Sequence, residues 1–340
     1  MLSFVNDYSE GCHEKILEKL VEVNREIVSG YGEDKYCVSA KEKIRKAIDC
    51  ETADIFFLYG GTQTNQVAID CFLEPYEAVV AATTGHVSLH EAGAIEFSGH
   101  KVIELPGKEG KLEADVVDKY LKGFFEDDNK DHMIFPGMVY ISQPTEYGTL
   151  YSLDELTDIS AVCEKYNVKL YVDGARLGYG LAAKANDVSM ADLARLTDGF
   201  YIGGTKVGAL CGEALVYPKG APKHMITRIK QHGALAAKGR TFGISFDVLF
   251  TDDLYVEISK HAIECADKLR EAFKKKGYKL YMENPTNQVF IELTYGKLEE
   301  LSKEIAFCFW EKLDDERCVV RCATSWATRV EDVDKLISII

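Results

Sequence analysis

The chain has 340 residues, of which 46% are apolar and 28% charged, and its formal net charge is −15. This composition is typical of a soluble globular protein with one large core and a smaller one, and the acidic balance argues against nucleic-acid binding as its main function. The ten cysteines include no CxxC pair, which argues against a metal site and favours a reducing, cytoplasmic location. We expect neither a signal peptide nor a membrane span.

Apolar periodicity predicts an alternation of helices and strands over the first two thirds of the chain. Two helices, near residues 14–28 and 40–48, come first. The strands that follow are nearly continuous apolar runs separated by helices, which indicates a mostly parallel sheet covered on both faces. These expected strands are residues 55–58, 78–81, 101–105, 138–141, 169–172 and 214–217, with helices from about 63, around 91, from 113 and at 152–166.

The pattern changes near residue 248, where a long helix is expected, followed by short strands and helices of an α+β unit. We therefore predict an α/β chain with a smaller C-terminal α+β domain. The predicted division is an N-terminal segment, 1–30, that packs with the small domain, a large domain, 31–247, and a small domain, 248–340.

Lys206 directly follows a short apolar run that ends in small residues, Phe200 to Thr205. A lysine at a buried strand end loses its proton more easily than an exposed one and can form a Schiff base with a carbonyl. Asp173 ends another apolar run, 168–172. A carboxylate and an amine at neighbouring strand ends are what pyridoxal 5′-phosphate (PLP) requires, one for the ring nitrogen and one for the aldehyde.

A glycine-rich turn, Gly60-Gly61-Thr62, separates the first sheet strand from a helix. Free N–H groups at such a helix start, together with the hydroxyl groups of Thr62 and Thr64, form a cradle for a dianion. The turn has neither the GxxxxGK[ST] nor the GxGxxG spacing, so a nucleotide-binding fold fits poorly. An ordinary strand-to-helix turn remains the alternative.

These residues resemble those of the low-specificity threonine aldolases, within the β-eliminating lyase group of fold-type I PLP enzymes. Asp173-Gly174-Ala175-Arg176 is similar to that family's Asp-Gly-Ala-Arg signature. The resemblance implies that Asp173 holds the pyridinium, Arg176 helps to bind the substrate carboxylate and Lys206 carries the cofactor. Gly60, Gly61, Thr62 and Asn65 resemble the phosphate loop of the family.

The resemblance extends to side chains with less certain roles. It implies that His86 stacks on the cofactor ring, that Arg321 binds the amino-acid carboxylate and that His132 lies near the substrate side chain. A solvated His132 and internal salt bridges for both arginines, Arg176 and Arg321, are the alternatives. Thr145 could reach the phenolic oxygen of the cofactor or simply shape a turn.

The chain also departs from the family pattern. Asn6-Asp7-Tyr8 stands where a Ser-Asp-Thr segment is usual, so Asn6 must take over substrate binding or the pocket differs. Lys238 and Arg240 could add positive charge near the phosphate, of a neighbouring subunit for example, or lie exposed on a helix.

The activity that the resemblance implies is PLP-dependent cleavage of L-threonine, L-allo-threonine or a related β-hydroxy amino acid to glycine and an aldehyde. The residues alone leave open β-elimination, transamination of another small amino acid and a non-enzymatic PLP-fold binding protein. The resemblance further implies a homodimer or homotetramer with shared active sites.

Overall fold

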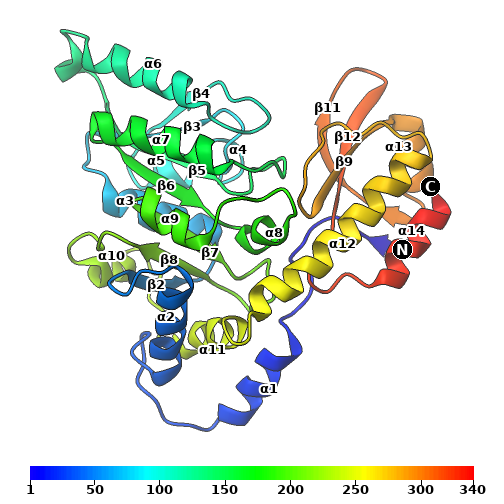
Figure 1. Ribbon diagram of the computed structural model, residues 1–340, viewed down its shortest axis with the longest axis horizontal. Coiled ribbons are helices and arrows are strands. Elements are labelled where there is room, and N and C mark those ends of the chain that lie inside the picture. Colours follow the sequence, from blue (N-terminus) through cyan, green and yellow to red (C-terminus); the bar gives the residue numbers. More distant parts are fainter.

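A computed structural model gives the structure of all 340 residues (Figure 1). Its larger part is a seven-stranded sheet of order β2-β8-β7-β6-β5-β3-β4. Strand β8 runs opposite to the other six strands and so pairs antiparallel with β2 and β7, whereas all remaining pairs are parallel. The strands are β2 (Asp54–Leu58), β3 (Glu77–Ala82), β4 (Val102–Leu105), β5 (Phe135–Ser142), β6 (Lys169–Asp173), β7 (Gly199–Gly203) and β8 (Glu213–Tyr217).

Helices cover both faces of this sheet, as the apolar strands predict. Every residue of β7 and β8 is buried, and one hydrophobic cluster lies on each side. On one face lie α2 (Lys35–Ala47), α6 (Ala114–Phe125), α7 (Leu153–Tyr166), α8 (Leu177–Ala182), α9 (Met190–Leu196) and α11 (Arg240–Leu249). On the other lie α3 (Gly61–Phe72), α4 (His86–Leu89), α5 (Ala94–Phe97) and α10 (Met225–Gln231).

The smaller part is an antiparallel sheet of order β11-β12-β9 with helices packed against it (Figure 1). Its elements are β9 (Gln288–Thr294), α13 (Tyr295–Leu301), β10 (Ile305–Ala306), β11 (Cys308–Lys312), β12 (Arg317–Ala323) and α14 (Val330–Ile339). The expected α/β fold with a smaller α+β unit is confirmed.

Long helix α12 (Leu254–Lys275) joins the two parts. Its first residues, Leu254 and Tyr255, belong to the large core, and its later residues, such as Leu269 and Phe273, belong to the small one. The predicted boundary at 247/248 falls within α11, just before this helix. The exact domain limits stay a prediction.

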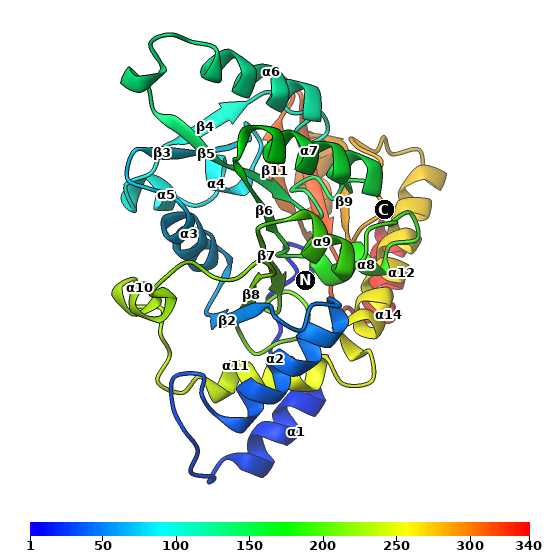
Figure 2. The same ribbon diagram turned by 60° about the vertical axis from the view of Figure 1, so that its left-hand side comes forward.

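The N-terminal segment contacts both parts of the molecule. Strand β1 (Leu2–Ser3) pairs with β10, and Phe4 lies in the small core. Helix α1 (Glu14–Val23) instead lies against α11 of the large part, as the second view also shows (Figure 2). The residues between them therefore cross from one part to the other.

Two expected helices are shorter than the sequence pattern suggests. The first ends at Val23 rather than near residue 28. The helix expected around residue 91 is divided into α4 and α5, because Ala92 adopts a φ of 50° in the left-handed region, which interrupts a right-handed helix. No helix of the structure is both long and apolar enough to cross a membrane.

Candidate active site

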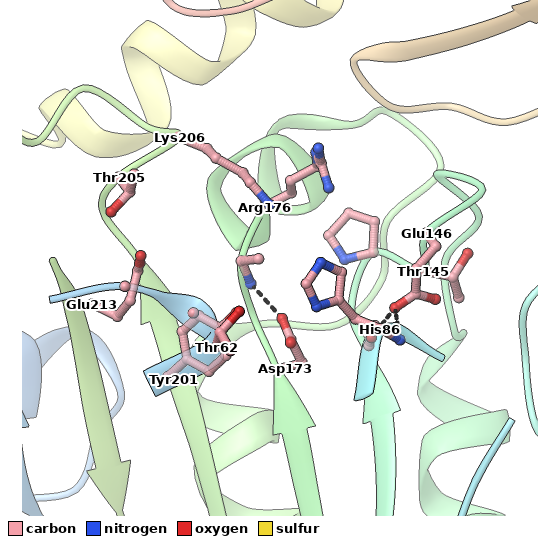
Figure 3. A pocket seen from close by; sticks show the side chains of 15 residues that line it. Thr62, His86, Thr145, Glu146, Asp173, Arg176, Tyr201, Thr205, Lys206 and Glu213 are labelled. Carbon is pink, nitrogen blue, oxygen red and sulfur yellow. Dashed lines mark hydrogen bonds between the residues drawn. The ribbon is translucent and has the colours of Figure 1, made fainter. Parts of the chain in front are cut away.

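A pocket lies where the carboxyl ends of the central strands meet the loops that follow them (Figure 3). Parallel strands bring their carboxyl ends to one edge of the sheet, so loops distant in sequence converge there. The residues that line the pocket are Gly60, Gly61, Thr62, His86, Ser142, Pro144, Thr145, Glu146, Asp173, Ala175, Arg176, Tyr201, Thr205, Lys206 and Glu213. The lysine, aspartate and glycine-rich turn singled out in the sequence thus share one pocket.

Asp173 ends β6 and is held as a buried carboxylate. Its Oδ2 accepts hydrogen bonds from Tyr140 Oη (2.6 Å) and Asn65 Nδ2 (2.9 Å), and its Oδ1 accepts one from the Ala175 N–H (2.9 Å). Burial acts to raise the pKa of Asp173, but nearby His86 and these hydrogen bonds outweigh burial and leave the pKa below its usual value. Asp173 therefore stays ionised and can pair with a cation.

Lys206 reaches the pocket from the loop after β7 (Figure 3). Burial and the Arg176 guanidinium lower its pKa to about 8, although nearby carboxylates oppose the shift. The approach of β7 to β6 depends on Gly174, where a Cβ would collide with the carbonyl oxygen of Tyr201. The lowered pKa leaves the Lys206 amine partly neutral near physiological pH and suited to nucleophilic attack.

The start of α3 forms another part of the pocket wall. Gly60 caps this helix without any side-chain hydrogen bond, so the first N–H groups of α3 remain available to an anion. A Cβ at Gly61 would lie 2.9 Å from the Tyr201 hydroxyl. Thr62 stands beside this turn and also lines the pocket (Figure 3). The Thr64 hydroxyl instead donates to the Gly60 carbonyl oxygen (2.9 Å) and does not line the pocket. The dianion cradle stays a prediction.

Asn65 has a different place from the one expected. It is fully buried in α3 and does not line the pocket. Its Nδ2 donates to Asp173 Oδ2 (2.9 Å) and to Glu91 Oε1 (2.8 Å). Because Asn65 lies in the second turn of α3, it orients these two carboxylates instead of facing the phosphate loop.

His86 begins α4 and points into the pocket (Figure 3). Its Nδ1 lies 2.7 Å from Glu91 Oε1, and its backbone N–H donates to Glu146 Oε1 (3.0 Å). Glu146 also accepts from the Ser142 hydroxyl (2.7 Å), and burial raises the pKa of its carboxyl. A carboxylate at Nδ1 favours the tautomer with a proton there and leaves Nε2 free to accept one.

Arg176 is already paired with a carboxylate. Its Nε and Nη2 donate to Oδ2 (2.7 Å) and Oδ1 (3.0 Å) of Asp7, and Asn287 Nδ2 also donates to Asp7 Oδ2 (2.9 Å). Burial opposes ionisation of Asp7, but the charges of Arg176 and Lys206 outweigh burial and lower its pKa to about 2. The internal salt bridge that the sequence left as an alternative is thus present.

Arg321, on β12, has no such counter-ion. It is 8% exposed and donates only to the neutral oxygens of Gln288 (2.8 Å) and Val5 (3.1 Å), while its Nε has no partner. Its guanidinium carbon lies 5.2 Å from the centre of the Trp310 ring. A buried charge without an ion pair is costly, so an anion bound to Arg321 would be stabilised. Arg321 itself lies outside the pocket lining.

The remaining sequence candidates divide between the pocket and other regions. Thr145 lines the pocket, and its hydroxyl lies 2.6 Å from that of Thr149. Asn6 is outside the pocket wall and accepts hydrogen bonds from Tyr8 N–H and the Ser9 hydroxyl in a local turn. Its substrate role stays a prediction.

His132 does not reach the pocket in this chain. It is exposed, ends the short 3₁₀ helix η1 (Lys130–His132), and precedes β5. The eight residues of β5 place it at the amino edge of the sheet, roughly 25 Å from Ser142. The expectation that His132 lies near the substrate is therefore not met within the chain.

The two basic residues of the 238–240 segment also lie away from the pocket lining. Arg240 donates to the carbonyl oxygens of Glu26 (2.8 Å) and Asn24 (3.1 Å), just after α1. Lys238 is exposed. Arg240 thus stabilises the end of α1, where carbonyl groups lack helical partners.

Several residues in or beside the pocket were not among the sequence candidates, including Asp7, which pairs with Arg176 but does not itself line the pocket. Asp7 could have been recognised from its place in the segment that departs from the family pattern. Glu213 carried another signal, because it is a charged residue at the start of an otherwise apolar strand. Glu146 and Tyr201 gave none, since their positions depend on how the loops fold together.

The chain as a whole is similar to known proteins. The sequence profile described as beta-eliminating lyase matches residues 8–295. A low specificity L-threonine aldolase of Pseudomonas aeruginosa is 30% identical, over 98% of this chain and 95% of that protein. A solved structure of Leishmania major threonine aldolase has a TM-score of 0.96 at 41% identity, over 100% of this chain and 98% of that one.

A more distant structure shares the fold. An aspartate aminotransferase of Thermus thermophilus has a TM-score of 0.73 at 14% identity, over 100% of this chain and 90% of that one, which shows a shared fold alone. The fold and the pocket thus define a fold-type I enzyme of the PLP-dependent class. Within that class, the chain belongs to the beta-eliminating lyase family. It is a lyase.

Proposed function

We propose that this protein is a PLP-dependent carbon–carbon lyase that cleaves L-threonine, L-allo-threonine or a related β-hydroxy amino acid to glycine and an aldehyde. The observation that carries the proposal is the convergence of Lys206, Asp173 and the start of α3 on one pocket. The similarity to threonine aldolases of Pseudomonas aeruginosa and Leishmania major supports the substrate class.

The pocket residues fit PLP. The uncapped first turn of α3, with no Cβ at Gly61, would hold the phosphate, and Lys206 would bind the aldehyde carbon. Ionised Asp173 would pair with the protonated ring nitrogen, and His86 would lie against the ring. When bound, PLP supplies an electron sink for the electron pair released as a bond to Cα breaks.

Arg321 would hold the substrate carboxylate, since it is buried and lacks a counter-ion. Arg176 is neutralised by Asp7, so it would contribute mainly through its unpaired Nη1. A carboxylate fixed at one end of the substrate selects which bond at Cα aligns for cleavage. Orientation of this kind accounts for a large part of catalysis in well-positioned reactions.

Retro-aldol cleavage also requires a base for the β-hydroxyl proton. His86 is placed for this role, because Glu91 holds its Nδ1 and Nε2 is left to accept a proton. The buried Glu91 carboxylate would then stabilise the imidazolium that forms.

We further propose a cytoplasmic homodimer or homotetramer. All ten cysteines are free, which suits a reducing compartment. The shared active sites follow from the family resemblance.

The proposal is tested by measuring aldehyde and glycine release from a panel of L- and D-β-hydroxy amino acids with the PLP-loaded protein. We expect acetaldehyde from L-threonine or L-allo-threonine. Pyruvate from L-serine, without aldehyde from any member of the panel, would instead assign β-elimination.

A further inference from the structure

Glu213 lies between the two loops that build the pocket. It is the first residue of β8, and its Cα is paired with Leu58 of β2 on one side and with Gly203 of β7 on the other. Leu58 leads into the Gly60-Gly61 turn, and Gly203 leads into the Lys206 loop. The sheet register thus fixes a carboxylate at the junction of the cradle and the lysine loop.

The side chain of Glu213 is buried in the pocket wall. It is 4% exposed, and its Oε2 accepts a hydrogen bond from the Gly204 N–H (2.8 Å). Figure 3 shows it beside Thr205, on the side of the pocket where Thr62 and Tyr201 lie. No lysine or arginine forms a salt bridge with it. Burial without a salt bridge raises the pKa of Glu213 to about 7.

The groups around Glu213 offer little compensation for its charge. Lys206 is the cation that favours ionisation of Glu213, and the hydrogen bonds to the Glu213 carboxyl group come from the Gly204 and Thr205 segment. The other titratable groups that face it are neutral thiol and phenol groups with raised pKa values: Cys211, Tyr171 of β6, Tyr201 of β7 and Tyr255 of α12.

A dianion at the start of α3 would share this pocket wall with Glu213. Two like charges in a buried site disfavour simultaneous ionisation, so the weaker acid takes a proton. We propose that Glu213 is protonated whenever the phosphate of the cofactor occupies the first turn of α3, so that cofactor binding takes up one proton from solvent. The inference rests on the proposed cofactor site, but not on which amino acid is cleaved.

Proton uptake can be counted by calorimetry of the cofactor-free protein in buffers of different ionisation enthalpy. Pyridoxine 5′-phosphate serves as the ligand, because it has no aldehyde and forms no covalent link to Lys206. At pH 8 we expect the wild type to take up close to one proton more per site than Glu213→Gln. At pH 5.5 the difference disappears, because Glu213 is already protonated without ligand.

The matched control is Glu146→Gln, which neutralises another buried carboxyl group of the same pocket. It should keep the proton uptake of the wild type. A Lys206→Ala background removes the titration of the lysine. Because Lys206 lowers the pKa of Glu213, the difference due to Glu213 should there be smaller at pH 8 and should recover at higher pH.

Equal proton counts for wild type and Glu213→Gln at pH 8, in variants whose circular dichroism matches the wild type, would overturn the inference. If the wild type instead binds neither pyridoxine 5′-phosphate nor PLP, the proposed function itself fails. If the proton uptake were lost in Glu146→Gln alone, the group that takes up the proton would be Glu146, on the His86 side of the pocket, and not Glu213.

Discussion

Individual residues in this pocket are tuned by burial as much as by their neighbours. The pKa of Lys206 is lowered, whereas Asp173 remains ionised despite its burial. Desolvation disfavours the charge on both, but only the carboxylate receives enough hydrogen bonds to keep its charge. The amine is therefore reactive while the acid stays anionic.

The pKa of Lys206 predicts how fast cofactor-free protein links covalently to PLP. Only the neutral amine attacks the aldehyde, so its reactive fraction falls about tenfold for each pH unit below about 8. The rate should therefore fall from pH 8 to pH 6 and level off above pH 9. Stopped-flow absorbance at saturating PLP measures it. Lys206→Ala should show no borohydride-reducible linkage, and a rate that is flat from pH 6 to 8 would contradict the prediction.

The two arginines should differ in their contribution to substrate binding. Arg321 has no counter-ion, whereas Arg176 pairs with Asp7. Hydrogen bonds to a charged group contribute about 1.5–3 kcal/mol, so Arg321→Gln should raise KM by about 10- to 150-fold. Arg321→Lys should recover part of the loss. Steady-state kinetics of aldehyde release test this, and an unchanged KM in Arg321→Gln would assign the carboxylate to another residue.

At the scale of elements, the edge of the parallel sheet decides which residues can meet. Strand ends were readable in the sequence as apolar runs, so Asp173, Lys206 and the Gly60 turn could be predicted as neighbours. Within one chain His132 lies away from the pocket, because a residue before a parallel strand lies at the opposite edge from the residues after it. Glu146 could not be predicted, since its loop is positioned by hydrogen bonds to Ser142 and His86.

The start of α3 gives a prediction about the phosphate cradle. Gly61→Ala should weaken PLP binding by at least about tenfold, because the added methyl group meets the Tyr201 hydroxyl at 2.9 Å and narrows the turn. Fluorescence titration of the cofactor-free protein measures the change. The matched control is Gly123→Ala in α6, where nothing lies within 4 Å of the added methyl group. This control should leave binding unchanged and stabilise the helix by about 0.5–1 kcal/mol. Equal affinity in both variants would argue against the cradle.

Over the whole molecule, Asp7 joins three parts of the chain. It lies in the segment that crosses between the two cores, it binds Arg176 next to α8, and it accepts from Asn287 next to β9. None of these contacts is local in sequence, so the sequence pattern could suggest the two cores but not the residue that connects them.

This connection predicts a pH-dependent stability. The pKa of Asp7 is about 2 in the folded protein against the usual 3.8 of an aspartate carboxyl, so its ionisation stabilises the fold by about 2 kcal/mol above pH 4. Because the pKa is lowered by folding, this contribution is present above the unfolded value and disappears as the pH falls through 2. Asp7→Asn should therefore lower the free energy of unfolding at pH 7.

The loss at pH 7 should reach about 3–5 kcal/mol, because Arg176 is left as a buried charge without its partner. Adding Arg176→Gln to Asp7→Asn should restore part of the stability, since the uncompensated charge is then gone. Thermal unfolding should be measured from pH 7 down to pH 3. The difference in stability between wild type and Asp7→Asn should narrow as Asp7 becomes protonated in the wild type. A gap that stays constant over this range would mean that Asp7 acts through packing and hydrogen bonds rather than through its charge.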